Sequence, residues 1–181
     1  ADKMYWSSDD SSTKIFELKY SSGAWVKTVS TDTTYPADAK YLIANSGRVF
    51  AYDPSGNQIF VSTILPDLAS TSTLFTTGGT TINPFKVGTG AETVTGMYSW
   101  VGTNVVVFCE NSVYVVDTNP LTAAAASAGN ATSTFTIRQV SNKSGAISHR
   151  AVAQVGEDLL YLSRDGVRSL KRTMAEEMVA N

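Results

Sequence analysis

The feature that most constrains this chain is a pattern of short apolar runs and polar turns that occurs twice, 54 residues apart. The segments Val101–Asp117 and Val155–Lys171 align without a gap, and each reads as a turn, an apolar run, a second turn and another apolar run. Short apolar runs bounded by turn residues predict β-strands, and two such runs joined by a short turn predict a hairpin. The repeat therefore predicts a fold built from antiparallel hairpins.

Two looser copies of the pattern precede the aligned pair. The first apolar residue of each second strand marks the series, and the markers are 44, 54 and 54 residues apart: Ile15, Ile59, Val113 and Val167. A repeat of about 40 to 50 residues with several strands in each unit is typical of a β-propeller blade. The sequence therefore predicts an all-β fold, a β-propeller-like arc of about four blade-like units, near residues 1–30, 40–63, 93–117 and 134–172.

We expect these units to form a single propeller-type domain across residues 1–181, with residues 173–181 as a tail or a severed connection. The segment Thr173–Ala180 is the one stretch that favours a helix, and a helix of this length is marginal unless it docks on the rest of the fold. The expected core consists of apolar strand residues: Phe50, Ile59, Val61, Val106, Phe108, Val113, Val115, Leu160, Leu162 and Val167.

The dipeptide Asp165-Gly166 lies between the apolar runs Leu159–Leu162 and Val167–Leu170. Asp-Gly in such a place is a strong hairpin signal, because both central residues of the favoured turn have a positive φ that Asp and Gly tolerate. We therefore predict a hairpin turn across Ser163–Gly166 in which Asp165 and Gly166 have positive φ.

The charge of the chain argues against a nucleic-acid-binding protein. The formal net charge is −2, and the 14 Lys and Arg residues are scattered, whereas nucleic-acid binders carry a clustered basic surplus. The one local concentration of basic residues comprises Arg164, Arg168, Lys171 and Arg172. This group is either a subunit contact or a phosphate-contacting basic patch, or simply a solvated hairpin edge. With 43% hydrophobic residues and no apolar run near the roughly 20 residues that a membrane helix needs, the sequence predicts neither a disordered nor a membrane protein.

Catalytic and metal-binding motifs are missing from the sequence. His149 is the sole histidine and Cys109 the sole cysteine, so an imidazole base has one candidate and a cysteine zinc site has too few ligands. The segment Asp53–Asn57 slightly resembles a calcium loop but lacks its ligand series, and turn chemistry explains it. We therefore expect a protein that is not an enzyme and that has no cofactor or metal.

A pair of carboxylates would be the remaining route to catalysis, because such pairs hydrolyse glycosides in some propellers. Asp117, Glu157 and Asp158 lie at expected strand ends. Spacing alone does not bring two of them together, and turn or edge carboxylates are the simpler interpretation.

Several segments between Tyr41 and Arg172 resemble the propeller region of phage tail nozzle proteins, the head-to-tail hub (stabilisation or tail tubular) proteins of short-tailed bacteriophages. The similar segments are Gly47–Phe50, Gln58–Ser62, Val94–Met97, Val105–Phe108, Ser112–Val116, Ser144–Val152 and Leu159–Leu170. The resemblance implies a non-enzymatic structural protein of the virion tail, assembled as a hexameric ring next to the portal or adaptor, whose channel passes duplex DNA without binding it tightly. Family members are longer, so the resemblance also implies a fragment of a larger chain.

A carbohydrate-binding propeller, lectin-like or glycosidase-like, is the alternative function. Its sugar platforms would be aromatic side chains, and the candidates are Trp6, Trp25 and Trp100. A lectin propeller would carry a tryptophan at the same position of every blade, and these three do not share one register, so core packing is the simpler role for them.

Overall fold

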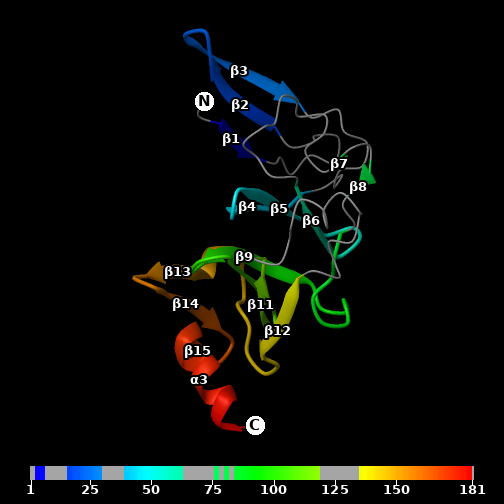
Figure 1. The fold of residues 1–181 in the computed structure, drawn as a ribbon. Helices are drawn as coiled ribbons and strands as arrows, with labels where there is room; N and C mark the ends of the chain where they lie inside the picture. Colours follow the sequence, from blue (N-terminus) through cyan, green and yellow to red (C-terminus); the bar gives the residue numbers. More distant parts are fainter. Residues whose placement is uncertain are drawn as a thin grey trace. The chain divides into compact units, whose positions relative to one another are not determined.

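The computed structural model describes residues 3–6, 16–29, 39–62, 76–77, 80–81, 84–118 and 135–180 (Figure 1). The chain divides into two compact units, residues 1–85 with 121–134, and residues 86–120 with 135–181. Ile15, the first marker of the repeat, lies outside the described residues, and so does Asn181.

The first unit contains two three-stranded antiparallel sheets and a small strand pair. Their strands are β1 (Lys3–Trp6), β2 (Phe16–Ser21), β3 (Ala24–Val29), β4 (Tyr41–Asn45), β5 (Arg48–Asp53), β6 (Gln58–Val61), β7 (Thr76–Thr77) and β8 (Thr80–Thr81). The strand orders are β1-β2-β3, β4-β5-β6 and β7-β8, so each strand pairs with its neighbour in sequence. Phe85 adds an isolated antiparallel bridge to Ile59 of β6.

The second unit contains a four-stranded sheet, a three-stranded sheet, a short 3-10 helix and an α-helix. The elements are β9 (Val94–Trp100), β10 (Asn104–Cys109), β11 (Val113–Asp117), β12 (Thr136–Ser141), η3 (His149–Ala151), β13 (Val152–Val155), β14 (Asp158–Ser163), β15 (Gly166–Ser169) and α3 (Leu170–Ala180). The strand orders are β12-β11-β10-β9 and β13-β14-β15. The described part of the chain is therefore mostly β, in antiparallel sheets, and none of these sheets closes on itself.

Strand β12 belongs to a different sheet from the one that its sequence suggested. The fourth blade-like repeat was expected to begin at residue 134. Instead β12 pairs with β11, with Val116 opposite Ile137, and completes the four-stranded β9–β12 sheet, which we call the third sheet. The β13–β15 sheet, which we call the fourth sheet, begins at Val152. The sequence of a strand that follows a long connection does not show which strand it will pair with. Only its backbone pairing with β11 in the structure assigns β12 to the third sheet.

The 54-residue repeat is present in the structure. Strand β10 covers Asn104–Cys109 and β14 covers Asp158–Ser163, a shift of 54 residues at both ends. The preceding turns also correspond, since Gly102 and Gly156 have φ values of 68° and 61°. A Cβ on either glycine would meet no atom within 4 Å, so the left-handed conformation, and not space, favours glycine there.

The turn between β14 and β15 differs from the prediction. Ser163 pairs with Gly166, so the loop residues are Arg164 and Asp165, and of these turn residues only Gly166 has a positive φ, at 119°. This arrangement fits a type I turn followed by a glycine at positive φ, the other common hairpin connection. Two adjacent positive φ values occur in two other turns, at Ser22-Gly23 with 53° and 84° and at Ser46-Gly47 with 51° and 71°.

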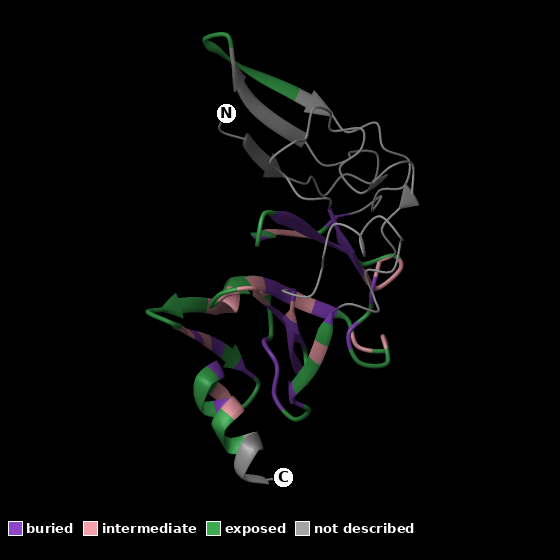
Figure 2. Ribbon diagram, in the orientation of Figure 1, coloured by how far each residue is buried: buried purple, intermediate pink, exposed green. Residues whose placement is uncertain are grey.

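Seven of the ten expected core residues are buried and three are not (Figure 2). Leu160 is half-buried, while Leu162 is 39% and Val167 is 72% exposed. Leu159 and Tyr161, each 1% exposed, take their place in the core. Alternate strand residues point to opposite faces, and Leu159–Leu162 is apolar at every position, so the sequence did not specify which set faces inward.

The core of the second unit lies between its two sheets. It is formed by Val106, Phe108, Val113, Val115, Val140, Ala146, Leu159, Tyr161 and Leu170. Phe108 of β10 and Tyr161 of β14 are in ring contact across this core, with centroids 5.0 Å apart. Leu170 attaches the start of α3 to the same core, which gives that short helix the docking it needs.

Candidate functional site

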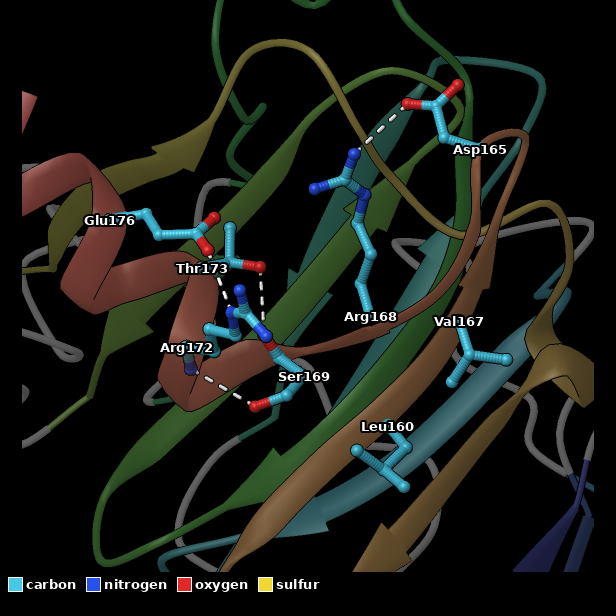
Figure 3. Close-up of a pocket in the computed structure, with 8 residues that line it drawn as sticks. All are labelled: Leu160, Asp165, Val167, Arg168, Ser169, Arg172, Thr173 and Glu176. Carbon is cyan, nitrogen blue, oxygen red and sulfur yellow. Dashed lines mark hydrogen bonds and ion pairs between the residues drawn. The ribbon is translucent and has the colours of Figure 1, made fainter.

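The four basic residues singled out in the sequence are distributed along β15, from the turn before this strand to the helix after it. Arg164 is in the β14–β15 turn, Arg168 is on β15, and Lys171 and Arg172 are in the first turn of α3. Beside them is a pocket of about 420 Å³ (Figure 3). Its lining residues are Leu160, Asp165, Val167, Arg168, Ser169, Arg172, Thr173 and Glu176.

Each of the four cations forms an ion pair with a carboxylate. The pairs are Arg164 with Glu110, Arg168 with Asp165 at 3.2 Å, Lys171 with Glu157 at 3.0 Å, and Arg172 with Glu176 at 2.9 Å. The local charges therefore cancel. We call these four pairs the ion-pair cluster.

The ion-pair cluster is poorly suited to hold phosphate. A phosphate group would have to compete with a carboxylate already bound to each cation, and the negative charges around it would repel it. The pairs are also largely solvent-exposed, so each contributes only about 0–1 kcal/mol to stability. Each cation that the sequence singled out has a carboxylate partner, so the ion-pair cluster presents balanced charge and not a basic surface.

One pair connects equivalent positions of two repeats. Glu110 and Arg164 are 54 residues apart and occupy corresponding turns of the two sheets. Because the sheets stack, these turns lie next to each other, and their opposite charges meet. Trp100 makes a similar link, since its Nε1 donates a hydrogen bond of 2.9 Å to the carbonyl oxygen of Glu157.

Asp158 has a structural role at the start of α3. Its Oδ1 accepts hydrogen bonds from the backbone N–H groups of Leu159 (2.8 Å) and Lys171 (3.0 Å), and its Oδ2 accepts one from Ser169 Oγ at 2.5 Å. Burial by itself would raise the pKa of Asp158, but these hydrogen bonds and the charge of Lys171 lower it overall. A carboxylate is favoured beside the free N–H groups of a helix N-terminus, so Asp158 joins β14 to α3.

Ser169 caps the same helix. Its Oγ accepts a hydrogen bond from the backbone N–H of Arg172 at 3.1 Å, and its carbonyl oxygen accepts one from Thr173 Oγ1 at 2.8 Å. Serine is among the preferred N-cap residues for this reason. The helix therefore begins at Leu170, three residues before the expected start at Thr173.

The other two carboxylates considered for glycoside hydrolysis also have structural partners. Asp117 Oδ1 accepts a hydrogen bond from Thr103 Oγ1 at 2.8 Å, and Glu157 pairs with Lys171. Asp117, Glu157 and Asp158 therefore all stabilise turns, strand ends or the start of α3 through hydrogen bonds or ion pairs.

Cys109 is buried in the second unit, and His149 of η3 is partly buried there. His149 stacks on Tyr98 with ring centroids 4.8 Å apart, and its carbonyl oxygen accepts a hydrogen bond from the Tyr98 hydroxyl. Burial, and then the charge of Arg150, lower the pKa of His149. Burial raises the pKa of Cys109 to about 11, although the hydrogen bond with Ser112 opposes this. A buried thiol with a raised pKa is a poor nucleophile.

The calcium-like loop is a turn that its own side chains stabilise. Asp53 Oδ1 accepts hydrogen bonds from the backbone N–H and the hydroxyl of Ser55, at 2.9 and 2.6 Å, which is the pattern of an Asx turn. Within the described ranges, no three His, Cys, Asp or Glu residues gather in a way that could hold a metal ion. Among those same ranges, no helix has the length and apolar character needed to cross a membrane.

The tryptophans considered as sugar platforms have different environments. Trp25 on β3 is 53% exposed. Trp100 is half-buried and packs against the core of the second unit. The side chain of Trp6 lies outside what the structure describes. Of the two tryptophans whose side chains the structure describes, Trp25 is the more exposed.

Three of the four acidic partners left a signal in the sequence. Asp165 lies among the four cations, three residues before Arg168, Glu110 aligns with Arg164 in the repeat, and Glu176 follows Arg172 at the i,i+4 spacing of helix ion pairs. Glu157 left no signal in the sequence of its pairing with Lys171, because the two residues meet only where the β13–β14 turn lies beside the start of α3.

No protein-family model matches this chain, and no curated protein matches its sequence.

Proposed function

We propose that this chain is a non-enzymatic structural part of a phage tail nozzle, with its sheets arranged as blades of a β-propeller-like arc. Three features support the arrangement: consecutive sheets with strands in sequence order, the 54-residue repeat, and the apolar packing of the third sheet on the fourth. Stacked antiparallel sheets of this kind are the units of a propeller. The resemblance of seven segments to nozzle proteins supports the virion location, the hexameric ring and the portal or adaptor as neighbours.

The observation that carries the proposed role toward DNA is the neutral ion-pair cluster. A channel that passes a genome must let phosphates slide, and tight DNA binding requires many unmatched Lys or Arg contacts. The one basic concentration in the sequence is matched by carboxylates, cation for cation. The chain is thus a passive wall for duplex DNA.

Fluorescence anisotropy with a short labelled duplex tests this role. We expect a dissociation constant weaker than about 100 μM at physiological salt, the weak end of non-specific binding. Replacing the four acidic partners (Glu110→Gln, Glu157→Gln, Asp165→Asn and Glu176→Gln) should uncover the cations and produce binding that weakens with salt.

Neutralising the four cations to Gln is the matched control, and this variant should leave the duplex unbound. Micromolar binding by the unaltered chain that is lost in the control would overturn the passive role. Antibodies against the chain should also label the tail vertex of the particle that encodes it in electron micrographs, and labelling elsewhere would contradict the virion location.

A carbohydrate-binding module is the second candidate, and exposed Trp25 is the observation in its favour. The apolar face of a sugar ring can pack on an exposed aromatic ring, because aromatic side chains provide a large apolar surface. Glycan-array binding that disappears with Trp25→Ala would favour this function over the nozzle.

A further inference from the structure

The turn between β14 and β15 contains the one Asp-Gly bond of the chain, Asp165-Gly166. The side chain of Asp165 is 61% exposed. A Cβ built on Gly166 would meet no atom within 4 Å, so the space beside the glycine is open. Neither the carboxyl group of Asp165 nor the backbone of Gly166 is therefore enclosed by other parts of the unit.

The exposure of Asp165 is a property of the turn and does not depend on what covers the faces of the fourth sheet. A shift of 54 residues puts Asp165 on Asn111, in the corresponding turn of the third sheet. Asn111 is exposed, although Phe108 and Val113 on either side of its turn are buried in the core between the two sheets. Packing against the face of such a sheet thus leaves the turn at its end open.

The carboxylate of Asp165 is weakly held. Its Oδ2 accepts a hydrogen bond of 3.2 Å from Nη2 of Arg168 (Figure 3), and an exposed ion pair of this kind contributes little to stability. The carboxylate of Asp158, by comparison, accepts three hydrogen bonds. Gly166 lies opposite Ser163 in the last pair of the hairpin, and pairs at the end of an element open more readily than those inside it. The side chain of Asp165 can therefore turn toward the nitrogen of Gly166.

We infer that Asp165 is a site of spontaneous modification, where aspartate is slowly converted to isoaspartate. The nitrogen of Gly166 attacks the side-chain carboxyl carbon of Asp165, and the amide proton leaves with the carboxyl hydroxyl as water. The product is a five-membered succinimide ring. Water then adds at the former main-chain carbonyl of Asp165 and opens the ring, so the backbone continues through the former side chain. Glycine favours the attack because it has no Cβ beside the nitrogen.

Isoaspartate lengthens the backbone of a short hairpin turn by one atom. The pairs Ser163–Gly166 and Leu162–Val167 follow directly from this turn, and the register of a hairpin is fixed by the length and type of its turn. The conversion therefore loosens the pairing of β14 with β15. It also leaves a free α-carboxyl group at position 165, which is the group that isoaspartyl methyltransferases methylate. This modification is independent of the proposed function in the phage tail.

Labelling by an isoaspartyl methyltransferase, with radioactive S-adenosylmethionine as the methyl donor, tests the inference. Samples of the unaltered chain kept at neutral pH for several weeks should accept an increasing amount of label. Peptide mapping should place this label at position 165, beside a minor peptide that is lighter by one water. Asp165→Glu should lose the label, because a glutamate would have to form a less favoured six-membered ring. The urea midpoint of this variant shows that it folds.

Asn111 is the matched control within the chain, because it has the same turn position and forms the same ring by loss of ammonia. Its Nδ2 donates a hydrogen bond of 3.2 Å to Glu92 Oε1, and Ser112, which supplies the attacking nitrogen, is 2% exposed. Isoaspartate at Asn111 should form at least about tenfold more slowly in the folded chain than in urea, because a buried turn must open first. At Asp165 the two rates should be comparable.

Three results would overturn the inference. The folded chain could gain no label at position 165, Asp165→Glu could keep that label, or folding could protect Asp165 as strongly as Asn111.

Discussion

Gly145 is the position where the structure predicts the largest effect of a single added methyl group. A Cβ on Gly145 would lie 2.0 Å from the carbonyl oxygen of Cys109, 2.7 Å from that of Ser112 and 2.9 Å from the carbonyl carbon of Cys109. All three are backbone atoms at the end of β10 and in the turn that follows it, so a side-chain rotation does not relieve the contact. The Gly145→Ala variant must separate two backbone segments.

The separation would disturb an ordered and buried region. Ser144 and Ala146 are 3% and 0% exposed. Thr95 Oγ1 donates a hydrogen bond of 2.6 Å to the carbonyl oxygen of Ala146, and Ser144 N–H donates one of 3.2 Å to Ser141 Oγ. Moving the segment away from Cys109 stretches these bonds.

The expected cost follows from two contributions. Overpacking of a dense interior costs about 1–3 kcal/mol, and a buried polar group that loses its partner costs about 1–3 kcal/mol more. We therefore expect Gly145→Ala to lower the free energy of unfolding by about 2–6 kcal/mol, a large part of the 5–15 kcal/mol typical of a domain.

Urea denaturation of Gly145→Ala beside the unaltered chain measures this cost. Gly102→Ala is the control, because its Cβ would meet no atom within 4 Å and its φ of 68° imposes backbone strain alone, about 1–2 kcal/mol. A Gly145→Ala variant that unfolds at the same urea concentration as the unaltered chain would refute the close backbone contact. A loss no larger than that of the control would show that the contact relaxes cheaply.

Two further predictions concern a turn and a titrating group. Gly166→Val should lower the free energy of unfolding by about 1–3 kcal/mol, the usual cost of backbone strain. Strain is the expected cause because φ is 119°, whereas a Cβ would meet no atom within 4 Å. An unchanged melting midpoint would contradict the positive φ. The lowered pKa of His149 means that protonation favours the unfolded chain, so stability should be constant above the ordinary histidine pKa of about 6.5 and decrease as pH falls below it. Urea denaturation at a series of pH values should show this decrease and its loss in His149→Gln, whereas an equal decrease in both would assign it to other groups.

Local sequence determined the hairpins of this protein. Gly102 and Gly156 were recognisable 54 residues apart because a left-handed turn needs a residue without a Cβ, whatever surrounds it. The apolar runs of β10 and β14 likewise specified strands, because a short apolar run between turns is stable mainly as a half-buried or buried strand. These turns and strands depend on residues a few positions away in the chain, so they can be predicted from the sequence alone.

Tertiary packing decided which faces and partners these hairpins use. In Leu159–Leu162 both alternate sets are apolar, so only the third sheet, by contacting Leu159 and Tyr161, determined which set is buried. Gly145 carries no local signal either, because its constraint comes from the carbonyl groups of a turn more than thirty residues earlier in the chain. The pairing of Lys171 with Glu157 likewise arises where a helix begins beside a turn. Contacts of this kind join residues that are distant in sequence, and their energies exist only once the sheets have stacked.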